Sequence, residues 1–257
     1  MPVRPSAACA AALLLCAAEA GAGAWTRPPG SAFLATGTSY YESGGDFPYE
    51  EATGSAYGEY GLTPGVTLGG SVEYKEPLGE NAPLGQELTV SGFGRFRLDV
   101  GEVGDPTAVQ LGVELPVDEA LGEGAARRPD APALELRMLY GRGFATPLGA
   151  GFVDAQGAFR ANLDDAADEV RIDLTAGVRP HPRWLGLVQS FNTIGLRNPS
   201  SNGDREGEDY DVHKLAPSLG FVLPGGVTML VGYEREIAGR NLEALGERWR
   251  LAFWREF

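Results

Sequence analysis

The C-terminal segment, Glu247-Arg-Trp-Arg-Leu-Ala-Phe-Trp-Arg-Glu-Phe257, is the strongest indicator of the fold. In an extended strand every second side chain points to the same face. One face of this strand is apolar and carries Trp249, Leu251, Phe253 and Phe257. The opposite face is charged and carries Arg248, Arg250 and Glu256. Chain ends of soluble proteins usually fray into water. Apolar residues that continue to the terminus therefore indicate a strand held in a larger sheet.

A terminal phenylalanine on an alternating strand resembles the closing strand of Gram-negative outer-membrane β-barrels. The resemblance implies that the barrel assembly machinery reads this strand, with Trp249, Leu251, Phe253 and Phe257 as the assembly signal. Arg255 departs from the pattern, which usually has an apolar residue two positions before the end. The alternative is the edge strand of a soluble sandwich, and the remaining sequence has to decide between the two.

Composition narrows the class of protein. The chain has 257 residues, 37 of them glycine, and a formal net charge of −14. Each glycine inside a helix costs about 1 kcal/mol relative to alanine, so this glycine content disfavours long helices. The acidic balance gives no general support for binding phosphates, and we expect no nucleic-acid partner.

The N-terminus reads as an export signal. Arg4 precedes an apolar run from Ala7 to Ala18, and small residues follow. The small-x-small pattern predicts cleavage after Ala22 or after Ala24, so that residues 1–24 are the signal and residues 25–257 the barrel domain. The run is too short for a membrane helix, which needs about 20 apolar residues.

Both cysteines, Cys9 and Cys16, fall inside this predicted signal. Lipoprotein processing at Cys16 is an alternative, although Leu15 before it is bulky where such signals have a small residue. After signal removal the chain would have neither a disulfide nor a cysteine-bound metal.

Strand-length alternating segments fill the rest of the chain, and their connectors fall into two kinds. Short Pro/Gly turns lie at 63–65, 146–149, 180–182 and 224–226, whereas longer and mostly acidic connectors lie at 42–51, 76–86, 116–133, 162–168 and 197–211. The two kinds alternate. An up-and-down membrane barrel has this pattern, with short periplasmic turns and longer extracellular loops. The sequence therefore predicts an all-β, antiparallel transmembrane barrel of about twelve strands in the outer membrane of a Gram-negative bacterium.

If the apolar face meets lipid, the polar face lines the lumen. The basic lumen candidates are Lys75, Arg95, Arg97, Arg137, Arg160, Arg171, Lys214, Arg248 and Arg250. The acidic ones are Glu59, Glu73, Glu114, Glu135, Asp154, Asp173 and Glu234. An unpaired buried charge is costly, so one interpretation is a cross-linked polar plug. The other is a narrow water path whose ion preference is set by Arg95, Arg97, Arg248 and Arg250.

Aromatic residues near strand ends predict two interfacial girdles. Tyr60, Tyr140, Trp184 and Phe257 would lie at the periplasmic end, and Tyr74 and Tyr233 at the outer end. The acidic loops show no EF-hand spacing, so we expect no metal and no cofactor. His181 and His213 have no serine at dyad spacing, and the sequence predicts no enzyme.

The segment Gly23-Ala24-Trp25-Thr26, followed by Pro and Gly, is similar to poorly characterised proteobacterial proteins of the XagA type. That resemblance implies a link to surface polysaccharide and biofilm. Three functions stay open: a porin-like pore for small solutes, an accessory barrel for polysaccharide secretion or adhesion, and a lipid-modifying hydrolase. The expected partners are outer-membrane lipid and lipopolysaccharide, the barrel assembly machinery, and a surface polysaccharide or small solute.

Overall fold

The strands begin and end where turn-forming residues interrupt the alternation. A computed structural model describes residues 23–45, 48–78, 86–98, 105–117, 132–163, 166–198, 209–242 and 244–257. Within these ranges the strands are β1 (Ala32–Ser43), β2 (Tyr49–Thr63), β3 (Val66–Leu78), β4 (Glu87–Leu98), β5 (Thr107–Pro116), β6 (Ala133–Thr146), β7 (Gly149–Asn162), β8 (Glu169–His181), β9 (Trp184–Gly195), β10 (Asp211–Val222), β11 (Thr228–Arg240) and β12 (Gly246–Glu256).

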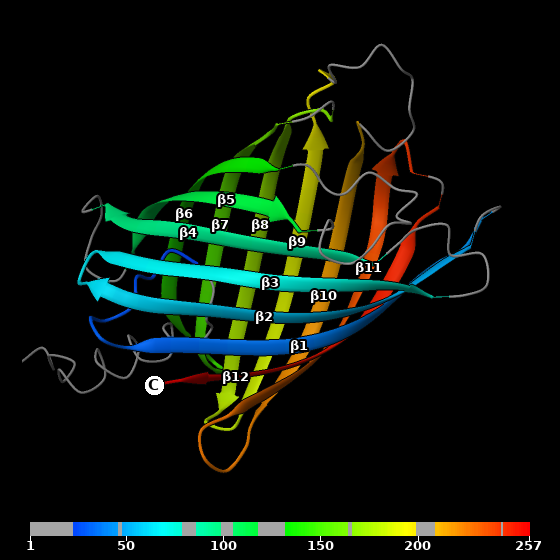
Figure 1. Ribbon diagram of the computed structural model, residues 1–257. Helices are drawn as coiled ribbons and strands as arrows, with labels where there is room; N and C mark the ends of the chain where they lie inside the picture. Colours follow the sequence, from blue (N-terminus) through cyan, green and yellow to red (C-terminus); the bar gives the residue numbers. More distant parts are fainter. Residues whose placement is uncertain are drawn as a thin grey trace, which may run out of the picture.

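Each strand pairs antiparallel with its neighbours in sequence, and β12 pairs with β1 to close a barrel (Figure 1). The closing register runs from Phe33 opposite Glu256 to Ser43 opposite Gly246. Beyond it, Phe257 N donates to Ala32 O over 2.8 Å and Ala32 N donates to Phe257 O over 3.1 Å. The prediction of a twelve-stranded up-and-down barrel, closed by the C-terminal strand, is confirmed.

The two ends of the barrel differ in their connectors. The turns at 64–65, 147–148, 182–183 and 223–227 share one end with the start of β1 and the end of β12, and we call this the short-turn end. In Figure 1 the C-terminus lies at the same end as the β2–β3 turn. The opposite end holds the end of β1 and the start of β2, the end of β9 and the start of β10, and the end of β11 and the start of β12; we call it the long-loop end. Pro64, Pro147 and Pro182 fix the backbone at the start of three tight turns.

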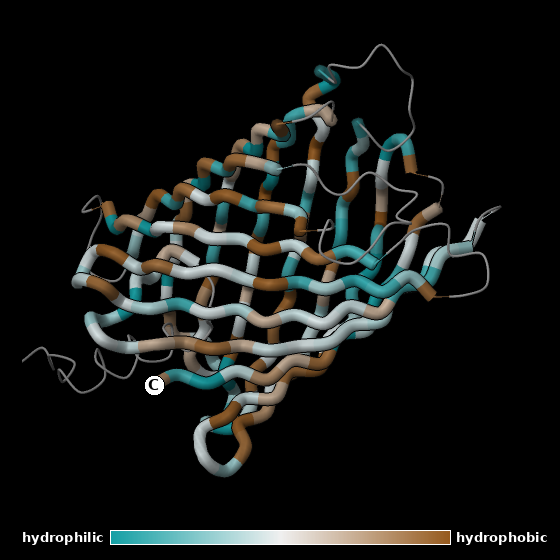
Figure 2. Tube along the Cα trace, viewed as in Figure 1, coloured by the Kyte–Doolittle hydropathy of each residue, from teal (hydrophilic) through white to brown (hydrophobic). Residues whose placement is uncertain are grey.

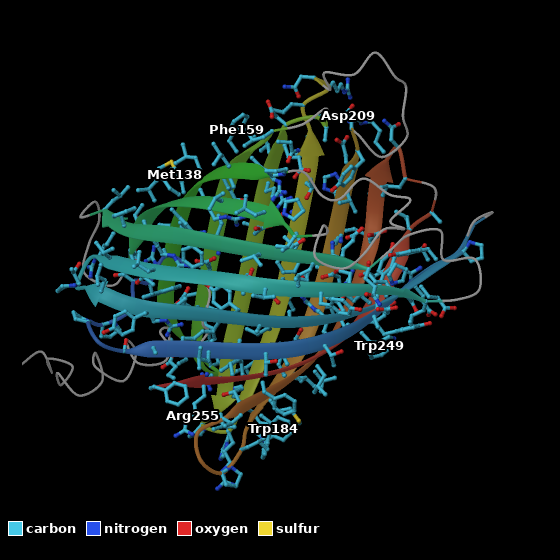
Figure 3. The ribbon with its side chains drawn as sticks, in the orientation of Figure 1. Met138, Phe159, Trp184, Asp209, Trp249 and Arg255 are labelled. Atoms are coloured by element: carbon cyan, nitrogen blue, oxygen red, sulfur yellow. The ribbon has the colours of Figure 1, made fainter. Side chains whose placement is uncertain are left out.

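The outward face of the barrel is apolar. Its exposed side chains include Leu111, Met138, Phe159, Leu174 and Leu219, each more than two-fifths exposed. Figure 2 shows brown positions alternating with paler or teal ones along the strands, and in Figure 3 Met138 and Phe159 point away from the barrel. No helix in the described ranges is long and apolar enough to cross a membrane.

Aromatic residues ring both rims of this face. Tyr60, Tyr140 and Trp184 lie near the short-turn end and are all exposed, and Trp184 packs on Phe221 with ring centroids 4.9 Å apart. Toward the other end Tyr233 packs on Trp249, also at 4.9 Å. These placements agree with the two predicted girdles.

Arg255, which departs from the closing-strand pattern, lies on the outward face beside the terminus. Its Cζ atom is 4.9 Å from the centroid of the Phe257 ring. A guanidinium at this rim keeps its charge near the polar boundary while its stem covers apolar surface. The departure is therefore compatible with membrane insertion at this position.

The alternation predicted from the sequence holds on most strands. The structure also shows which side chains of β9 face outward, which could not be assigned from the sequence. Trp184 and Val188 point outward and are about half exposed, whereas Leu185 and Leu187 point into the barrel and are buried. Residues 1–22 lie outside the described ranges, so the predicted export signal stays a prediction.

Candidate functional site

The chain segment ahead of β1 turns into the barrel. Gly23, Ala24 and Arg27 are buried, and Pro28 and Pro29 redirect the backbone out to the rim. Gly30 N donates to Gly61 O over 2.8 Å and so joins the exit of this segment to β2. In Figure 1 the dark-blue start of the chain lies behind β1–β3 at the short-turn end. We call residues 23–28 the N-terminal plug.

Trp25 is the apolar body of the N-terminal plug. It packs against a cluster of inward-facing residues, with Ala252 and Trp254 at its edge; the buried members are Phe152, Leu185, Leu187 and Leu230. Gly141 provides room for the indole, because a Cβ there would overlap the Trp25 ring. Ala24 is fully buried between Ala108 and Leu139. The short-turn half of the lumen is thus filled by apolar packing.

Arg27 anchors the N-terminal plug by charge. Its Nε lies 2.6 Å from Glu59 Oε2, and its Nη1 lies 2.6 Å from Glu256 Oε1. Its backbone N also donates to Thr67 Oγ1 over 2.8 Å. Burial lowers the pKa of Arg27, but Glu59 and then Glu256 raise it, and the net shift is upward. Arg27 therefore stays charged and ties the plug to β2 and β12.

Glu59 is shared between the plug and the barrel wall. Arg95 Nη2 lies 3.0 Å from Glu59 Oε1, and Tyr57 OH donates to the same oxygen over 2.5 Å. Arg95 Nη1 donates to the carbonyl oxygen of Trp25 over 3.4 Å. Arg95, a predicted lumen residue, is therefore an anchor of the plug rather than the wall of an open path.

Further toward the long-loop end the lumen charges pair both along and across strands. Arg137 Nε lies 2.7 Å from Glu135 Oε1, and its Nη1 lies 2.6 Å from Asp173 Oδ2. Arg160 Nη2 lies 2.7 Å from Glu114 Oε1 on β5. The remaining pairs on this wall join Arg171 to Glu169 at 2.8 Å and to Glu135 at 3.9 Å.

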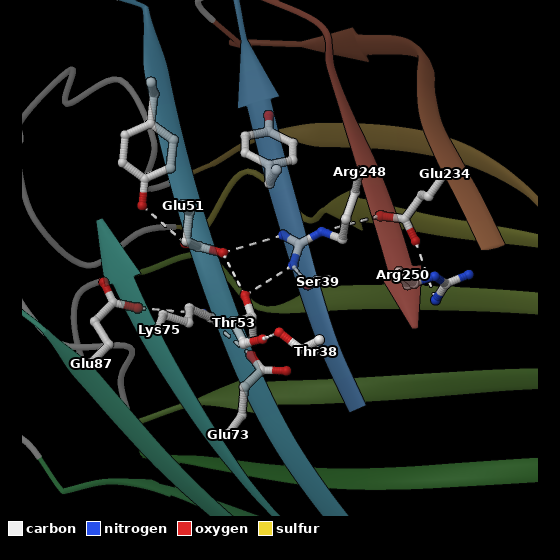
Figure 4. Close-up of polar contacts among 12 residues, drawn as sticks. Thr38, Ser39, Glu51, Thr53, Glu73, Lys75, Glu87, Glu234, Arg248 and Arg250 are labelled. Atoms are coloured by element: carbon white, nitrogen blue, oxygen red, sulfur yellow. Dashed lines mark hydrogen bonds and ion pairs between the residues drawn. The ribbon is translucent and has the colours of Figure 1, made fainter. Parts of the chain in front are cut away.

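A second group of charges faces this one from β2, β11 and β12 (Figure 4). Arg248 lies between Glu51, at 3.4 Å, and Glu234, at 3.8 Å. Arg250 Nη1 reaches the other oxygen of Glu234 at 3.5 Å, while its Nε and Nη2 have no hydrogen-bond partner among the described residues. Beside them Lys75 pairs with Glu87 at 3.3 Å and Glu73 at 3.7 Å. Most of the predicted charges thus pair, which agrees with the first of the two interpretations.

A polar cavity of about 730 Å³ occupies the long-loop end of the lumen. Its basic lining residues are Arg171, Lys214 and Arg250, and its acidic ones are Glu73, Glu234 and Glu236. Side chains here keep contact with solvent: Arg171 and Lys214 are about a quarter exposed, against 7% for Arg27 and 5% for Arg95. The lumen is open and polar at one end and tightly filled at the other.

Two predicted lumen residues differ from the others. Arg97 lies at the short-turn rim of β4 and is exposed. Asp154 is buried, and it accepts hydrogen bonds from Ala24 N at 3.1 Å and Gln156 Nε2 at 2.6 Å rather than forming an ion pair. Arg27, Glu51 and Glu169 are not among the predicted lumen residues, and Glu256 was placed on the charged face of its strand without a partner, because these pairs depend on strand register and on the path of the tail.

Neither histidine faces a serine within the described residues. His213 Nδ1 lies 2.9 Å from Asn192 Oδ1, and Asn192 Nδ2 donates to Ser190 Oγ over 3.1 Å. An amide that donates to a hydroxyl cannot remove its proton. The contacts from His213 through Asn192 therefore do not activate Ser190 as a nucleophile. His181 Nδ1 accepts from Arg183 N in a turn. The described ranges contain no group of three or more His, Cys, Asp or Glu side chains arranged to hold a metal.

No family model matches the sequence, and no curated protein matches it. The resemblance to XagA-type proteins is not confirmed. Three solved structures are similar in fold. The COG4313 outer membrane channel from Pseudomonas putida F1 has a TM-score of 0.58 and 14% identity, covering 92% of this chain and 99% of its own. The NanC porin has a TM-score of 0.56 and 8% identity, covering 86% and 98%. The KdgM porin has a TM-score of 0.51 and 7% identity, covering 86% and 99%. At these identities the likeness shows the fold, and the chain has the closed antiparallel all-β architecture of these outer-membrane barrels.

Proposed function

We propose that the protein is an outer-membrane channel for small polar solutes, held closed at rest by its N-terminal plug. The observation that carries the proposal is the polar cavity of about 730 Å³ at the long-loop end, directly above a filled short-turn end. On β12 the inward residues that follow Arg250 toward the short-turn end are Ala252 and Trp254, which both pack against the Trp25 cluster. On β11 the inward residues that follow Glu234 are Gly232 and Leu230, and Leu230 belongs to the same cluster. The path therefore ends on the plug.

Membrane insertion follows from the outward face. Its apolar band and aromatic rims match a transmembrane barrel, and the short turns would face the periplasm. In this proposal the band contacts outer-membrane lipid and lipopolysaccharide. The barrel assembly machinery recognises the closing strand, on which Trp249 and Phe257 point outward and are exposed. The three similar structures, described as a channel and two porins, support the assignment to transport.

The cavity indicates which solutes pass. Basic and acidic side chains line it in equal number, and most of them already pair with one another. Such a wall offers hydrogen bonds to small polar solutes of either charge and no strong net field. Pairing also narrows the passage, so large solutes are excluded.

The experiment compares two glycines on the same inward face of β6. Gly141→Val adds a side chain where a Cβ already overlaps the Trp25 ring, whereas a Cβ at Gly143 meets nothing within 4 Å. In planar bilayers the wild type and Gly143→Val should carry only small-ion leak. Gly141→Val should displace the plug and give stable single-channel steps. Adding Arg248→Glu to Gly141→Val should then shift the preference toward cations, because charge in a narrow lumen sets selectivity.

A wild type that already passes sugar-sized solutes would contradict closure at rest. The plug also supports a second function, that of a non-conducting accessory barrel for surface polysaccharide or adhesion. Trp25→Gly separates the two, since it removes the largest side chain of the plug without adding bulk. If both Trp25→Gly and Gly141→Val are folded and carry no single-channel current, the paired charges close the lumen by themselves and the accessory function is favoured.

A further inference from the structure

Asp154 is the exception among the charged groups of the filled half of the lumen. It lies on β7 and is 3% exposed. Its carboxylate accepts from Ala24 N and Gln156 Nε2, and it forms no ion pair with any described residue. Glu59, by contrast, forms ion pairs with both Arg27 and Arg95. Burying a carboxylate without a cation is unfavourable by several kcal/mol, so a cation placed beside Asp154 would stabilise its charged form.

Gly23 lies directly against this carboxylate. It is buried and has a φ of +118°, a conformation that other residues rarely adopt. A Cβ built on it would overlap Asp154 Oδ2. One tetrahedral position on the Gly23 Cα is thus aimed at the carboxylate. If Gly23 were the first residue, a partial rotation about its Cα–C bond would swing the α-nitrogen toward Asp154 Oδ2 and stop at hydrogen-bond distance, short of the position where a Cβ overlaps the carboxylate.

We propose that the mature chain begins at Gly23 and that its α-ammonium group forms a buried ion pair with Asp154. Hydrolysis by the leader peptidase of the export pathway breaks the amide bond between Ala22 and Gly23. Water supplies the hydroxyl that completes the Ala22 carboxylate and a proton for the Gly23 amine. The ammonium donates to Asp154 Oδ2, which also accepts from Ala24 N.

The structure favours this bond over the other one that the sequence allows. Cleavage after Ala24 would remove Gly23 and Ala24. That loss would empty the site between Ala108 and Leu139 that Ala24 fills, and it would take one hydrogen-bond donor from Asp154. Cleavage after Ala22 keeps both residues and adds the missing cation. Processing and closure of the lumen are then linked, because the ion pair exists only in the processed chain.

The first test is the mass of the mature protein. The full coding sequence is expressed in a Gram-negative host, and the folded barrel is purified from the outer membrane and analysed by intact mass and by its N-terminal peptide. The expected first residue is Gly23. A chain that begins at Trp25, or one that retains the residues before Gly23, would overturn the proposal.

The second test measures access to the amine. A water-soluble acylating reagent near neutral pH should label the Gly23 amine slowly in the folded wild type and quickly after denaturation, with Lys75 and Lys214 as internal references. Asp154→Asn should raise the folded-state rate about tenfold or more, the factor that corresponds to losing about 1.4 kcal/mol. Asp173→Asn is the matched control, because Asp173 pairs with Arg137 at 2.6 Å.

Gly23→Ala is a second variant that leaves Asp154 in place. Its methyl group overlaps the carboxylate, and it should also raise the labelling rate. Heat-modifiable migration shows which variants are folded. Equal labelling of the wild type in folded and denatured states would overturn the ion pair, as would rates in Asp154→Asn and Gly23→Ala that match the Asp173→Asn control. Neither test measures solute passage, so its failure is distinguishable from failure of the proposed channel function.

Discussion

Removing the charge of Arg27 should open the channel. Arg27→Met keeps the length of the stem but removes two ion pairs of 2.6 Å, to Glu59 and Glu256. Taking one partner from a buried pair costs about 3–5 kcal/mol. The lower value applies here, because Glu59 keeps Arg95 at 3.0 Å and the Glu256 side chain is 37% exposed. Docking of the plug should therefore weaken by about 3 kcal/mol, or roughly a hundredfold.

The assay is the fraction of time that single channels spend open in planar bilayers, with labelling of the N-terminal amine as a second readout. Arg27→Lys should give an intermediate value, because lysine restores the charge but not the two directed contacts. Arg142→Met is the control: Arg142 is 60% exposed and lies 3.8 Å from Asp105, and exposed pairs contribute little. If Arg27→Met changes neither the open fraction nor the labelling rate, charge does not hold the plug.

Three further predictions concern the barrel itself. Leu174→Arg, on the outward face, should lower the free energy of unfolding in lipid by about 2–4 kcal/mol, whereas Thr175→Arg, on the lumen side, should cost less; equal effects in chemical denaturation would mean that the faces are reversed. Deleting Phe257 removes both hydrogen bonds that extend the closing register to Ala32, so the amount of heat-modifiable protein in the outer membrane should fall, and an unchanged yield would contradict the closing role. The Arg240 hydrogen bonds lower the pKa of Asp209 below its ordinary value, so the contact is fully stabilising above about pH 4 and is lost as the pH falls through the lowered pKa; protection from hydrogen exchange near Asp209 should be lower in Asp209→Asn than in the wild type at neutral pH, and the two should converge at acidic pH.

The barrel could be predicted from the sequence because its physics is local. Alternation with a period of two places Leu88 and Val90 opposite Thr89 and Ser91 whatever the distant chain does, and proline fixes the tight turns. The observed strand bounds lie within a few residues of the predicted segments, with the longest differences at loop-side ends. Alternation also placed Arg171 and Arg248 on the polar face, but it did not identify their partners Glu169 and Glu51.

The plug could not be predicted, because residues 23–30 have no period and two adjacent prolines. One signal was present in β9. Leu185 and Leu187 alternate with Trp184 and Val188, so both faces of the strand are apolar, and its facing could not be assigned. A membrane strand with an apolar lumen face requires an apolar group inside the barrel. Identifying Trp25 as that group needs the three-dimensional path of the tail.

The contact between Arg27 and Glu256 joins positions 229 residues apart, and it spans the seam where β1 meets β12. Loop-closure entropy makes such a contact one of the last to form during folding. Glu59 lies on the other neighbour of β1, so a single guanidinium bridges both sides of the strand that completes the cylinder. A sheet in which β12 has not yet paired with β1 lacks one of the two carboxylates that bind Arg27. The N-terminal plug therefore docks fully only after β12 has paired with β1. Any later separation of β1 from β12 would release the plug.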